Sequence, residues 1–228
     1  MFKLGLALFA SLLALGTAAA ADLPAKMYTK APAMAAPPPF SWTGFYVGGN
    51  VGYSWGRQDI TVGGVSAGTV KVNGVIGGGQ LGYNWQVNQI VLGLEADIQA
   101  SGQKGDGTIS PFAALNVTTT YRDKLDWFGT LRGRLGYAAD HWLPYVTAGW
   151  AFGHGNISGS STAPVSFSGS KNYSGWTVGG GLEWAFRNNW SAKLEYLYID
   201  FGDGPTTPVI ATGRLTDNIL RVGVNYHF

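Results

Sequence analysis

The sequence of 228 residues contains no cysteine and few charged residues. The lack of cysteine excludes disulfide bonds, thiolate metal sites, a cysteine nucleophile and a lipidated N-terminal cysteine. Charged residues make up 12% of the chain, about half the share of an ordinary soluble domain. The formal net charge is only +2, so nothing in the charge balance indicates nucleic acid as a partner.

Long apolar runs are scarce, and the one at the N-terminus has the pattern of an export signal. A positive start at Lys3 is followed by an apolar stretch over 4–15 and by small residues over 19–21. We therefore predict a signal peptide over residues 1–21. A transmembrane helix over 4–21 is the alternative, which is disfavoured because its second half is mostly alanine and no charged stop-transfer flank follows.

Proline is concentrated just after this signal. Residues 22–41 contain five of the ten prolines, among Ala, Lys and Thr. This composition favours an extended linker over packed structure. We predict a free periplasmic linker over 22–41, followed by one folded domain over 42–228.

The folded part is rich in glycine, with 35 residues in the whole chain, and in aromatic residues, at 14%. Apolar residues alternate with small polar ones, and alternate side chains of a β-strand share one face. Phe128, Leu197 and Ile199 interrupt the alternation. We predict eight strands, within residues 45–55, 75–86, 92–99, 125–137, 145–152, 176–186, 190–199 and 217–228. The small polar faces suit the crowded interior of a narrow barrel, and the apolar faces suit lipid.

The connections between these segments alternate strictly between short and long. Short turns lie at 87–89, 139–141 and 187–189, and the long connections span about 56–71, 101–123, 155–173 and 202–215. In an up-and-down barrel this places all short turns at one rim and all long loops at the other. The predicted fold class is all-β, an eight-stranded antiparallel up-and-down transmembrane β-barrel of the outer membrane, with both chain ends in the periplasm.

Two similar stretches, GGNVGYSW and GGQLGYNW, end consecutive antiparallel strands. Their Tyr and Trp residues, at 53 and 55 and at 83 and 85, therefore fall at opposite rims. Aromatic rings with one polar atom favour the membrane–water interface. We predict an outer girdle that also contains Trp127, Trp150, Trp176 and Tyr198, and an inner girdle that also contains Tyr137, Trp184, Trp190, Tyr226 and Phe228.

Nine charged residues fall on the inward faces of the predicted strands. They are Glu95, Asp97, Asp126, Glu183 and Glu195, with Arg132, Arg134, Lys193 and Arg221. Charges that face a dry lumen must be paired, and an eight-stranded interior is just wide enough for side chains. We predict a cluster of ion pairs, with Glu95 near Arg132, and with Lys193 and Glu195 near Glu183 and Arg221. This pattern favours a polar plug over a path for protons or ions.

One glycine motif is typical of a dinucleotide-binding site. Gly77, Gly79 and Gly82 fit G-x-G-x-x-G, and Glu95 lies eighteen residues after Gly77. A dinucleotide site needs a helix after this motif, but residues 83–86 lead into a turn without helical periodicity. We predict strand glycines and no bound cofactor.

Histidine provides little support for catalysis or metal binding. His141, His154 and His227 have neither metal-ligand spacing nor a Ser-His-Asp arrangement. Only His154, which precedes Ser158 and Ser160 near the outer rim, leaves hydrolysis of lipid A open as a minor hypothesis. We predict no catalytic and no metal-binding residues.

Several motifs carry a family resemblance over nearly all of the mature chain. They are FSWTGFYVGGNVGYSWG, GGGQLGYNWQ, LDWFGTLRGRLGYA, PYVTAGWAFG, GWTVGGGLEWAF, WSAKLEYLYIDFG and NILRVGVNYHF. The sequence resembles the small outer-membrane immunogenic, porin-family eight-stranded β-barrels of alphaproteobacteria. The resemblance implies an abundant envelope protein that exposes its loops as antigens, in contact with outer-membrane lipid and lipopolysaccharide. Some relatives bind haem, but no haem pattern can be carried over to this chain.

The C-terminus resembles an assembly signal. Alternate apolar residues end in Tyr226 and Phe228, as in the signal that the outer-membrane assembly machinery reads. The expected partners are therefore this machinery and periplasmic chaperones, and we expect a monomer. The favoured function is a structural and surface-interaction barrel that supports envelope integrity. A narrow porin for ions or small solutes is the alternative, and a lipid-modifying enzyme is a weaker one.

Overall fold

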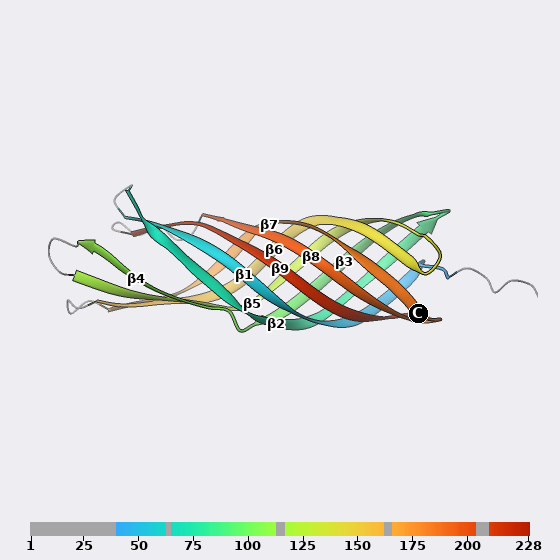
Figure 1. The fold of residues 1–228 in the computed structure, drawn as a ribbon, viewed down its shortest axis with the longest axis horizontal. Helices are drawn as coiled ribbons and strands as arrows, with labels where there is room; N and C mark the ends of the chain where they lie inside the picture. The colour runs from blue at the N-terminus through green and yellow to red at the C-terminus, as the bar shows by residue number, and fades with distance from the viewer. Residues whose placement is uncertain (1–39, 63–64, 113–116, 162–165, 204–209) are drawn as a thin grey trace, which may run out of the picture. The chain divides into compact units, whose positions relative to one another are not determined.

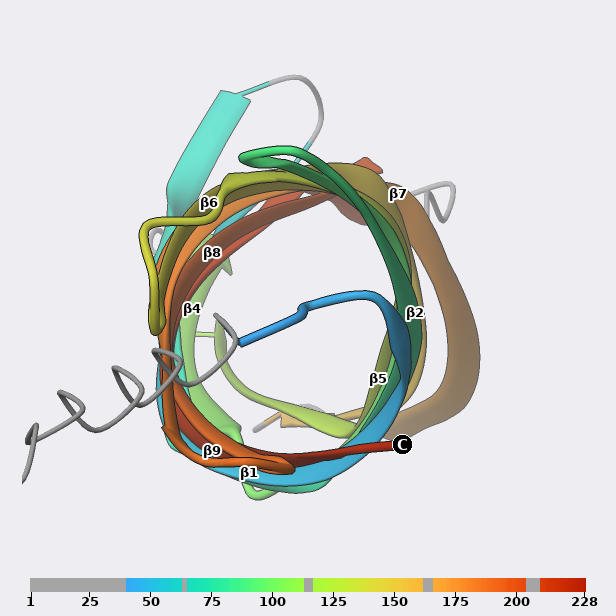
Figure 2. The ribbon, with the colours of Figure 1, turned by 90° about the vertical axis from the view of Figure 1, so that its right-hand side faces the viewer.

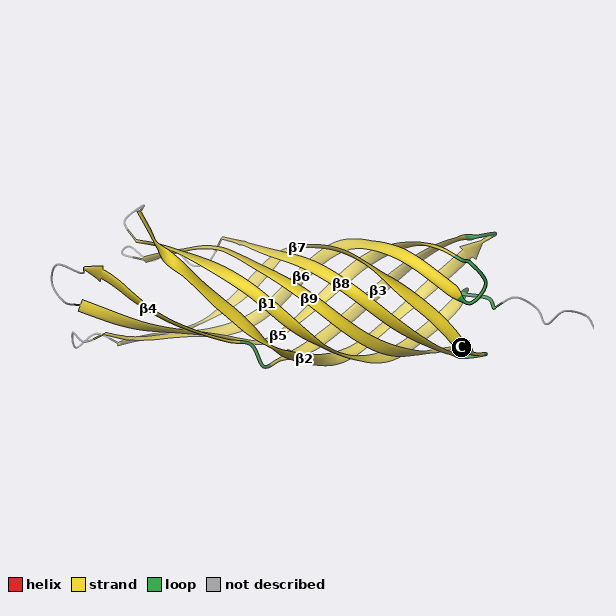
Figure 3. Ribbon diagram, in the orientation of Figure 1, coloured by secondary structure: helices red, strands yellow, loops and turns green. Residues whose placement is uncertain are grey.

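The structure, a computed structural model, describes residues 40–62, 65–112, 117–161, 166–203 and 210–228. The predicted signal peptide and all but the end of the predicted linker lie outside these residues. The described residues form nine β-strands (Figures 1 and 3), with no helix long and apolar enough to cross a membrane. The strands are β1 (Gly44–Val62), β2 (Val65–Val87), β3 (Ile90–Ser101), β4 (Lys104–Phe112), β5 (Val117–Tyr137), β6 (Trp142–Ser161), β7 (Ser166–Arg187), β8 (Trp190–Asp203) and β9 (Ile210–His227).

The strands close into one antiparallel barrel. β1 pairs with both β2 and β9, so the sheet has no free edge between the first and the last strand. β4 continues the place of β3 beside β5 after an interruption at Gly102 and Gln103. The barrel wall therefore has eight strand positions, as predicted, and Figure 2 shows it as a closed ring in end view.

The two ends of the barrel differ. One end carries the short connections at 88–89, 138–141 and 188–189 together with Phe228, and we call it the turn end. Asn88 and Asp140 have φ angles of 54° and 52°, a left-handed conformation that Asn and Asp tolerate in tight turns. The opposite end, on the left in Figure 1, carries the long hairpins β1–β2, β4–β5, β6–β7 and β8–β9, and we call it the hairpin end.

The four long connections are mostly strand rather than loop. β1 and β2 stay paired from Gly44 opposite Asn84 up to Val62 opposite Val65. The predicted strand boundaries at this end were therefore too short. Threonine, valine and serine recur in these stretches and suit a β-ribbon, although the alternation of apolar and polar faces is lost there.

The two faces of the wall have opposite chemistry. In β1, Val47 and Val51 are exposed on the outside, whereas Asn50 and Ser54 are buried inside. Inward glycines make room for large side chains: a Cβ atom on Gly82 would lie 2.5 Å from the ring of Tyr46. The alternation that the sequence shows thus corresponds to an apolar outer surface and a crowded polar interior.

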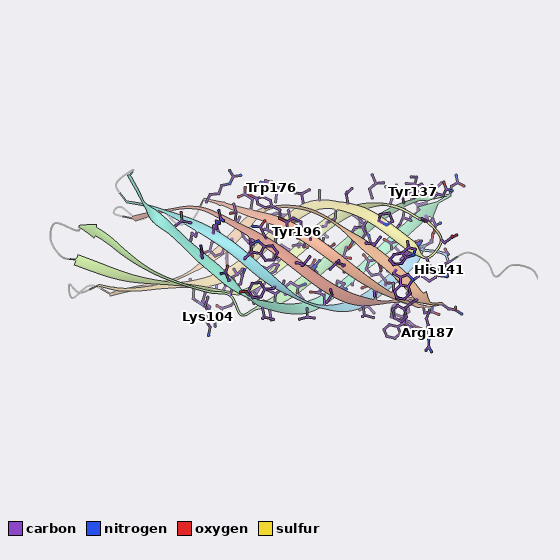
Figure 4. The ribbon with its side chains drawn as sticks, in the orientation of Figure 1. Lys104, Tyr137, His141, Trp176, Arg187 and Tyr196 are labelled. Carbon is purple, nitrogen blue, oxygen red and sulfur yellow. The ribbon has the colours of Figure 1, made fainter. Side chains whose placement is uncertain are left out.

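Aromatic side chains form two bands on the outer surface. At the hairpin side they include Tyr53, Trp55, Trp127, Trp150, Trp176 and Tyr196, and at the turn end Tyr83, Trp85, Tyr137, Trp142, Trp184 and Trp190. Figure 4 shows Trp176 toward the hairpin end and Tyr137 at the turn end. Trp142 stacks on Trp184, with ring centroids 5.6 Å apart. The predicted girdles are present, and Trp142 and Tyr196 add to them.

Candidate functional site in the barrel interior

Six charged side chains meet inside the barrel, and we call them the ionic layer. Three are cations and three are anions, so their formal charges cancel. They come from four strands: Glu95 and Asp97 on β3, Arg132 on β5, Lys193 and Glu195 on β8, and Arg221 on β9. Each is at most 6% exposed. Charges buried this deeply are stable only when they are paired and hydrogen-bonded.

Arg132 contacts all three anions of the ionic layer. Its Nη1 lies 2.9 Å from Glu195 Oε1, and its Nη2 lies 2.9 Å from Asp97 Oδ2. Nη2 also forms an ion pair with Glu95, the residue opposite Arg132 in the register of β3 and β5. The Nε–H group donates to Thr130 Oγ1 at 2.8 Å. Arg132 therefore joins two walls of the barrel across the interior.

The other two cations complete the ionic layer from the opposite wall. Arg221 Nε donates to Glu195 Oε2 at 2.6 Å, and Arg221 Nη2 donates to Asp97 Oδ2 at 3.0 Å. Lys193 Nζ donates to both carboxylate oxygens of Glu95 at 2.9 Å. The predicted pairs of Glu95 with Arg132 and of Glu195 with Arg221 are thus present.

Glu183 does not take the partner that the sequence predicts. It lies opposite Lys193 in the register of β7 and β8, but the amino group of Lys193 reaches across the lumen instead. Glu183 forms an ion pair with Arg134, and it accepts hydrogen bonds from Ser191 and from Asn225 Nδ2, the latter at 2.8 Å. The lumen therefore contains a second neutral pair on the turn-end side of the ionic layer.

Two tyrosines connect these groups. Tyr46 donates its hydroxyl to Glu95 Oε2 at 2.7 Å, and Tyr145 donates to Glu195 Oε1 at 3.0 Å. The guanidinium of Arg134 lies over the Tyr145 ring, with its Cζ 3.7 Å from the ring centroid. Cation–π contact compensates a desolvated guanidinium through the negative face of the ring. The sequence pattern gave no sign of these two contacts.

Asp126 is the one predicted lumen charge that the structure places outside. Where β5 pairs with β6 the register shifts between Leu125 and Trp127, and this bulge turns Leu125 inward and Asp126 outward. Asp126 forms a 2.8 Å ion pair with Lys124 and accepts a hydrogen bond from Asn156. The prediction was wrong because a single extra residue reverses the faces of the strand beyond it.

An apolar layer fills the interior between the ionic layer and the hairpin end. It consists of Ile76, Leu125, Phe128, Ala151, Tyr173, Leu197, Ile199, Phe201, Leu215 and Ile219, each at most 6% exposed. The signal for this layer was present in the interruptions of the alternation at Phe128, Leu197 and Ile199. Those residues are inward, and together they form a dry core between the ionic layer and the hairpin end.

A buried carboxylate lies beside this apolar layer on the hairpin side. Asp217 accepts hydrogen bonds from Ser54 and from Gln103, with Gln103 Nε2 2.8 Å from Oδ2. Gln103 lies in the interruption between β3 and β4. The adjoining cavity, which Val72 and Leu215 also line, has a volume of about 10 Å³. This is no more than one water molecule needs.

The segment that precedes β1 packs into the opening at the turn end. Figure 2 shows it crossing the ring. Trp42 is fully buried, and its backbone N–H group donates to Gln86 Oε1 at 2.9 Å. Its ring lies 4.8 Å from that of Phe40 and 5.8 Å from that of His227. Phe40, which the sequence assigned to the free linker, thus packs with the barrel, because an aromatic pair can bury itself in the opening.

The predicted assembly signal lies on the outer surface at the turn end. Phe228 is 74% exposed, and its ring is 5.2 Å from that of Tyr226. The backbone N–H of Phe228 donates to the carbonyl of Phe45 at 3.0 Å. The last residue of the chain is therefore held against the first strand, where the barrel closes.

Comparison with known proteins agrees with this architecture. The family model described as "Outer membrane protein beta-barrel domain" matches residues 6–228. The chain belongs to this outer-membrane β-barrel family. The 31 kDa outer-membrane immunogenic protein of Brucella melitensis is 37% identical over 219 residues, which cover 87% of this chain and 88% of that protein. The 22 kDa outer membrane protein of Rhizobium leguminosarum is 36% identical over 164 residues, covering 72% and 66%. The 25 kDa outer-membrane immunogenic protein of Brucella abortus is 30% identical, covering 84% and 81%.

Family membership explains the exposed apolar surface. Leu94, Leu131 and Val146 are each more than half exposed at the middle of the wall. This arrangement would be costly in water, but it is the normal one for the lipid-facing band of an outer-membrane β-barrel. The relatives are outer-membrane proteins of Gram-negative bacteria, and the two aromatic bands fit the two interfaces of that membrane.

The glycine motif of this outer-membrane barrel lies within one strand. Gly77, Gly79 and Gly82 all belong to β2, and no helix follows the motif. Gly82 faces inward beside Tyr46, and Gly77 and Gly79 face outward. Glu95 is part of the ionic layer. The motif is thus a series of strand glycines.

The histidines occupy three separate places. His154 is on the outer surface, where its Nδ1 lies 2.8 Å from Asn172 Oδ1 and its ring stacks on Trp127. The side chains of Ser158 and Ser160 lie outside the described residues. His227 is buried at the turn end, 2.9 Å from Ser191 Oγ, and His141 lies in a turn.

Proposed function

We propose that this outer-membrane barrel is a structural and surface-display protein whose lumen is closed by its own side chains. The observation that carries the proposal is the filling of the interior in successive layers. The aromatic pair Phe40 and Trp42 packs at the turn end, the ionic layer follows, and the apolar layer lies toward the hairpin end. Such a barrel crosses the membrane without adding a leak, which supports envelope integrity.

The alternative of a narrow porin is disfavoured by the way in which the charges are held. An eight-stranded barrel has an interior just wide enough for side chains. Ions would have to displace Arg132 and Arg221, which are each 1% exposed and bound to three carboxylates. They would then have to cross the apolar layer, where desolvated ions find no partner. Conductance is therefore the property that separates the two functions.

The proposed orientation places the turn end in the periplasm and the hairpin end at the cell surface. Outer-membrane barrels have short periplasmic turns and longer extracellular connections. Tyr226 and Phe228 at the turn end would then be accessible to the periplasmic side of the assembly machinery during insertion. The Brucella relatives are called immunogenic proteins, which agrees with display of the hairpins.

Orientation can be tested with single cysteines because the chain has none of its own. A membrane-impermeant maleimide should label Ser170→Cys, in the β6–β7 hairpin, on intact cells. Ala139→Cys, in a short turn, should be labelled only after the outer membrane is permeabilised. Both positions are exposed in the structure, so accessibility in the folded barrel is matched. The opposite pattern would show that the hairpins face the periplasm.

A further inference from the structure

Four basic residues lie side by side on the outer surface near the hairpin end, and we call them the basic row. They are Arg57 on β1, Lys71 on β2, Lys104 on β4 and Lys124 on β5. All four side chains are exposed, and Figure 4 shows Lys104 pointing away from the wall. None of them takes part in the interior networks described above.

The strand register places like charges opposite each other on neighbouring strands. Arg57 lies directly opposite Lys71, and Lys104 lies directly opposite Lys124. Asn73 on β2 pairs with Lys104 and joins the two pairs into one row. Residues directly opposite in antiparallel strands have Cβ atoms about 4.5–5.5 Å apart, and like charges there are destabilising. A ligand with negative charge would remove this repulsion.

Among the side chains that the structure describes, the basic row has one counter-charge. Lys124 forms an ion pair with Asp126 at 2.8 Å. Within the described residues, Arg57, Lys71 and Lys104 have no carboxylate at ion-pair distance. Among the described side chains, three of the four cations of the row therefore have no anionic partner.

The depth of the basic row identifies the kind of anion. Arg57 follows Trp55 by two residues on the same face of β1, and Lys124 precedes Trp127 by three residues on β5. One residue spans about 3.3 Å along a strand, so the cations lie just beyond the aromatic band. That is the level at which the lipid headgroups of the adjoining leaflet carry their phosphates.

We propose that the basic row binds the phosphate groups of a lipid A headgroup in the outer leaflet. Arg57 can hold one phosphate with two parallel N–H···O bonds, and the lysines act as point charges around it. The two like-charged pairs match a headgroup that carries two separate phosphates. This inference rests on the proposed orientation of the barrel, because lipid A is found in the outer leaflet.

The test uses the mature protein refolded in detergent micelles and titrated with bisphosphorylated lipid A. The variants are Arg57→Gln with Lys71→Gln, and Lys104→Gln with Lys124→Gln. Each cation removed should weaken binding about fivefold, so each double variant should lose roughly 25-fold. Arg187→Gln, an exposed cation at the turn end labelled in Figure 4, is the matched control and should bind like the unmodified protein.

Three further titrations identify the source of the phosphate. Lipid A stripped of phosphate should bind equally weakly to all variants, inorganic phosphate should compete only poorly, and phosphatidylglycerol should bind less tightly than lipid A. Equal losses in Arg187→Gln and the double variants, or equal binding of dephosphorylated lipid A or phosphatidylglycerol, would overturn the proposal. Micelle binding does not depend on orientation in the cell, so a failed cysteine-labelling test would refute the orientation separately.

Discussion

Replacing Arg132 by Ala should lower the free energy of unfolding by about 3–5 kcal/mol, because removal of one partner leaves buried charge uncompensated. Arg132 contacts Glu95, Asp97 and Glu195, and after its loss Lys193 and Arg221 remain to balance three carboxylates. The measurement is urea unfolding in lipid vesicles, followed by the fluorescence of the nine tryptophans.

Paired variants separate the loss of charge from the loss of packing. Arg132→Lys keeps the charge but not the fork of donors, so it should cost less than Arg132→Ala. Arg132→Met combined with Glu95→Gln removes one charge of each sign and should be less destabilising than the sum of the two single changes. An Arg132→Ala protein that unfolds within about 1 kcal/mol of the unmodified protein would show that the ionic layer does not stabilise the barrel.

Replacing Leu131 by Arg should cost about 2–4 kcal/mol, since it places a charge on the lipid face near the middle of the membrane. Leu131 is 52% exposed on the outer surface, between Trp127 toward the hairpin end and Tyr137 at the turn end of β5. It is the immediate neighbour of Arg132, which is 1% exposed inside. We therefore expect the first of these two consecutive positions to require an apolar side chain and the second to require a charged one.

Thr177→Val is the matched control for the face assignment. Thr177 is 1% exposed inside the barrel, and its hydroxyl donates to the Tyr198 carbonyl at 3.0 Å. The loss of this hydrogen bond should cost about 1 kcal/mol. Urea unfolding that ranks Thr177→Val as more damaging than Leu131→Arg would mean that the faces are reversed.

The alternation of side chains was sufficient to predict the barrel and most of its interior. A period of two fixes which residues share a face, so Glu95, Arg132 and Arg221 could be assigned to the lumen without coordinates. Adjacent strands then fix near neighbours, which gave the pair of Glu95 and Arg132. The glycines and aromatic residues, such as Gly82 and Trp184, followed from the same two faces.

Features that depend on a local shift of register or on the closure of the barrel could not be predicted. The bulge beside Asp126 has no clear signature in the residues around it, yet it reverses the face of Leu125. Lys193 has a flexible side chain that can reach several carboxylates. It binds Glu95 rather than Glu183, and this pairing depends on the closed cross-section of the barrel. Trp42 is buried at the opening of the closed ring, and the sequence around it does not show that this opening exists.

The apolar layer was predictable in principle. Phe128, Leu197 and Ile199 interrupt the alternation at positions where the period of two places a side chain on the inward face. Three apolar residues at inward positions on two strands indicate a dry part of the lumen. The sequence therefore contained evidence for a closed interior in addition to the paired charges.

Single-channel recording in a planar lipid bilayer tests the closed lumen most directly. Folded protein, verified by its shifted gel mobility before boiling, should insert without steps of conductance. A general porin studied in the same bilayer provides the positive control for insertion and detection. Regular steps large enough for the free passage of sugars would contradict a lumen filled by Arg132, Arg221 and the apolar layer.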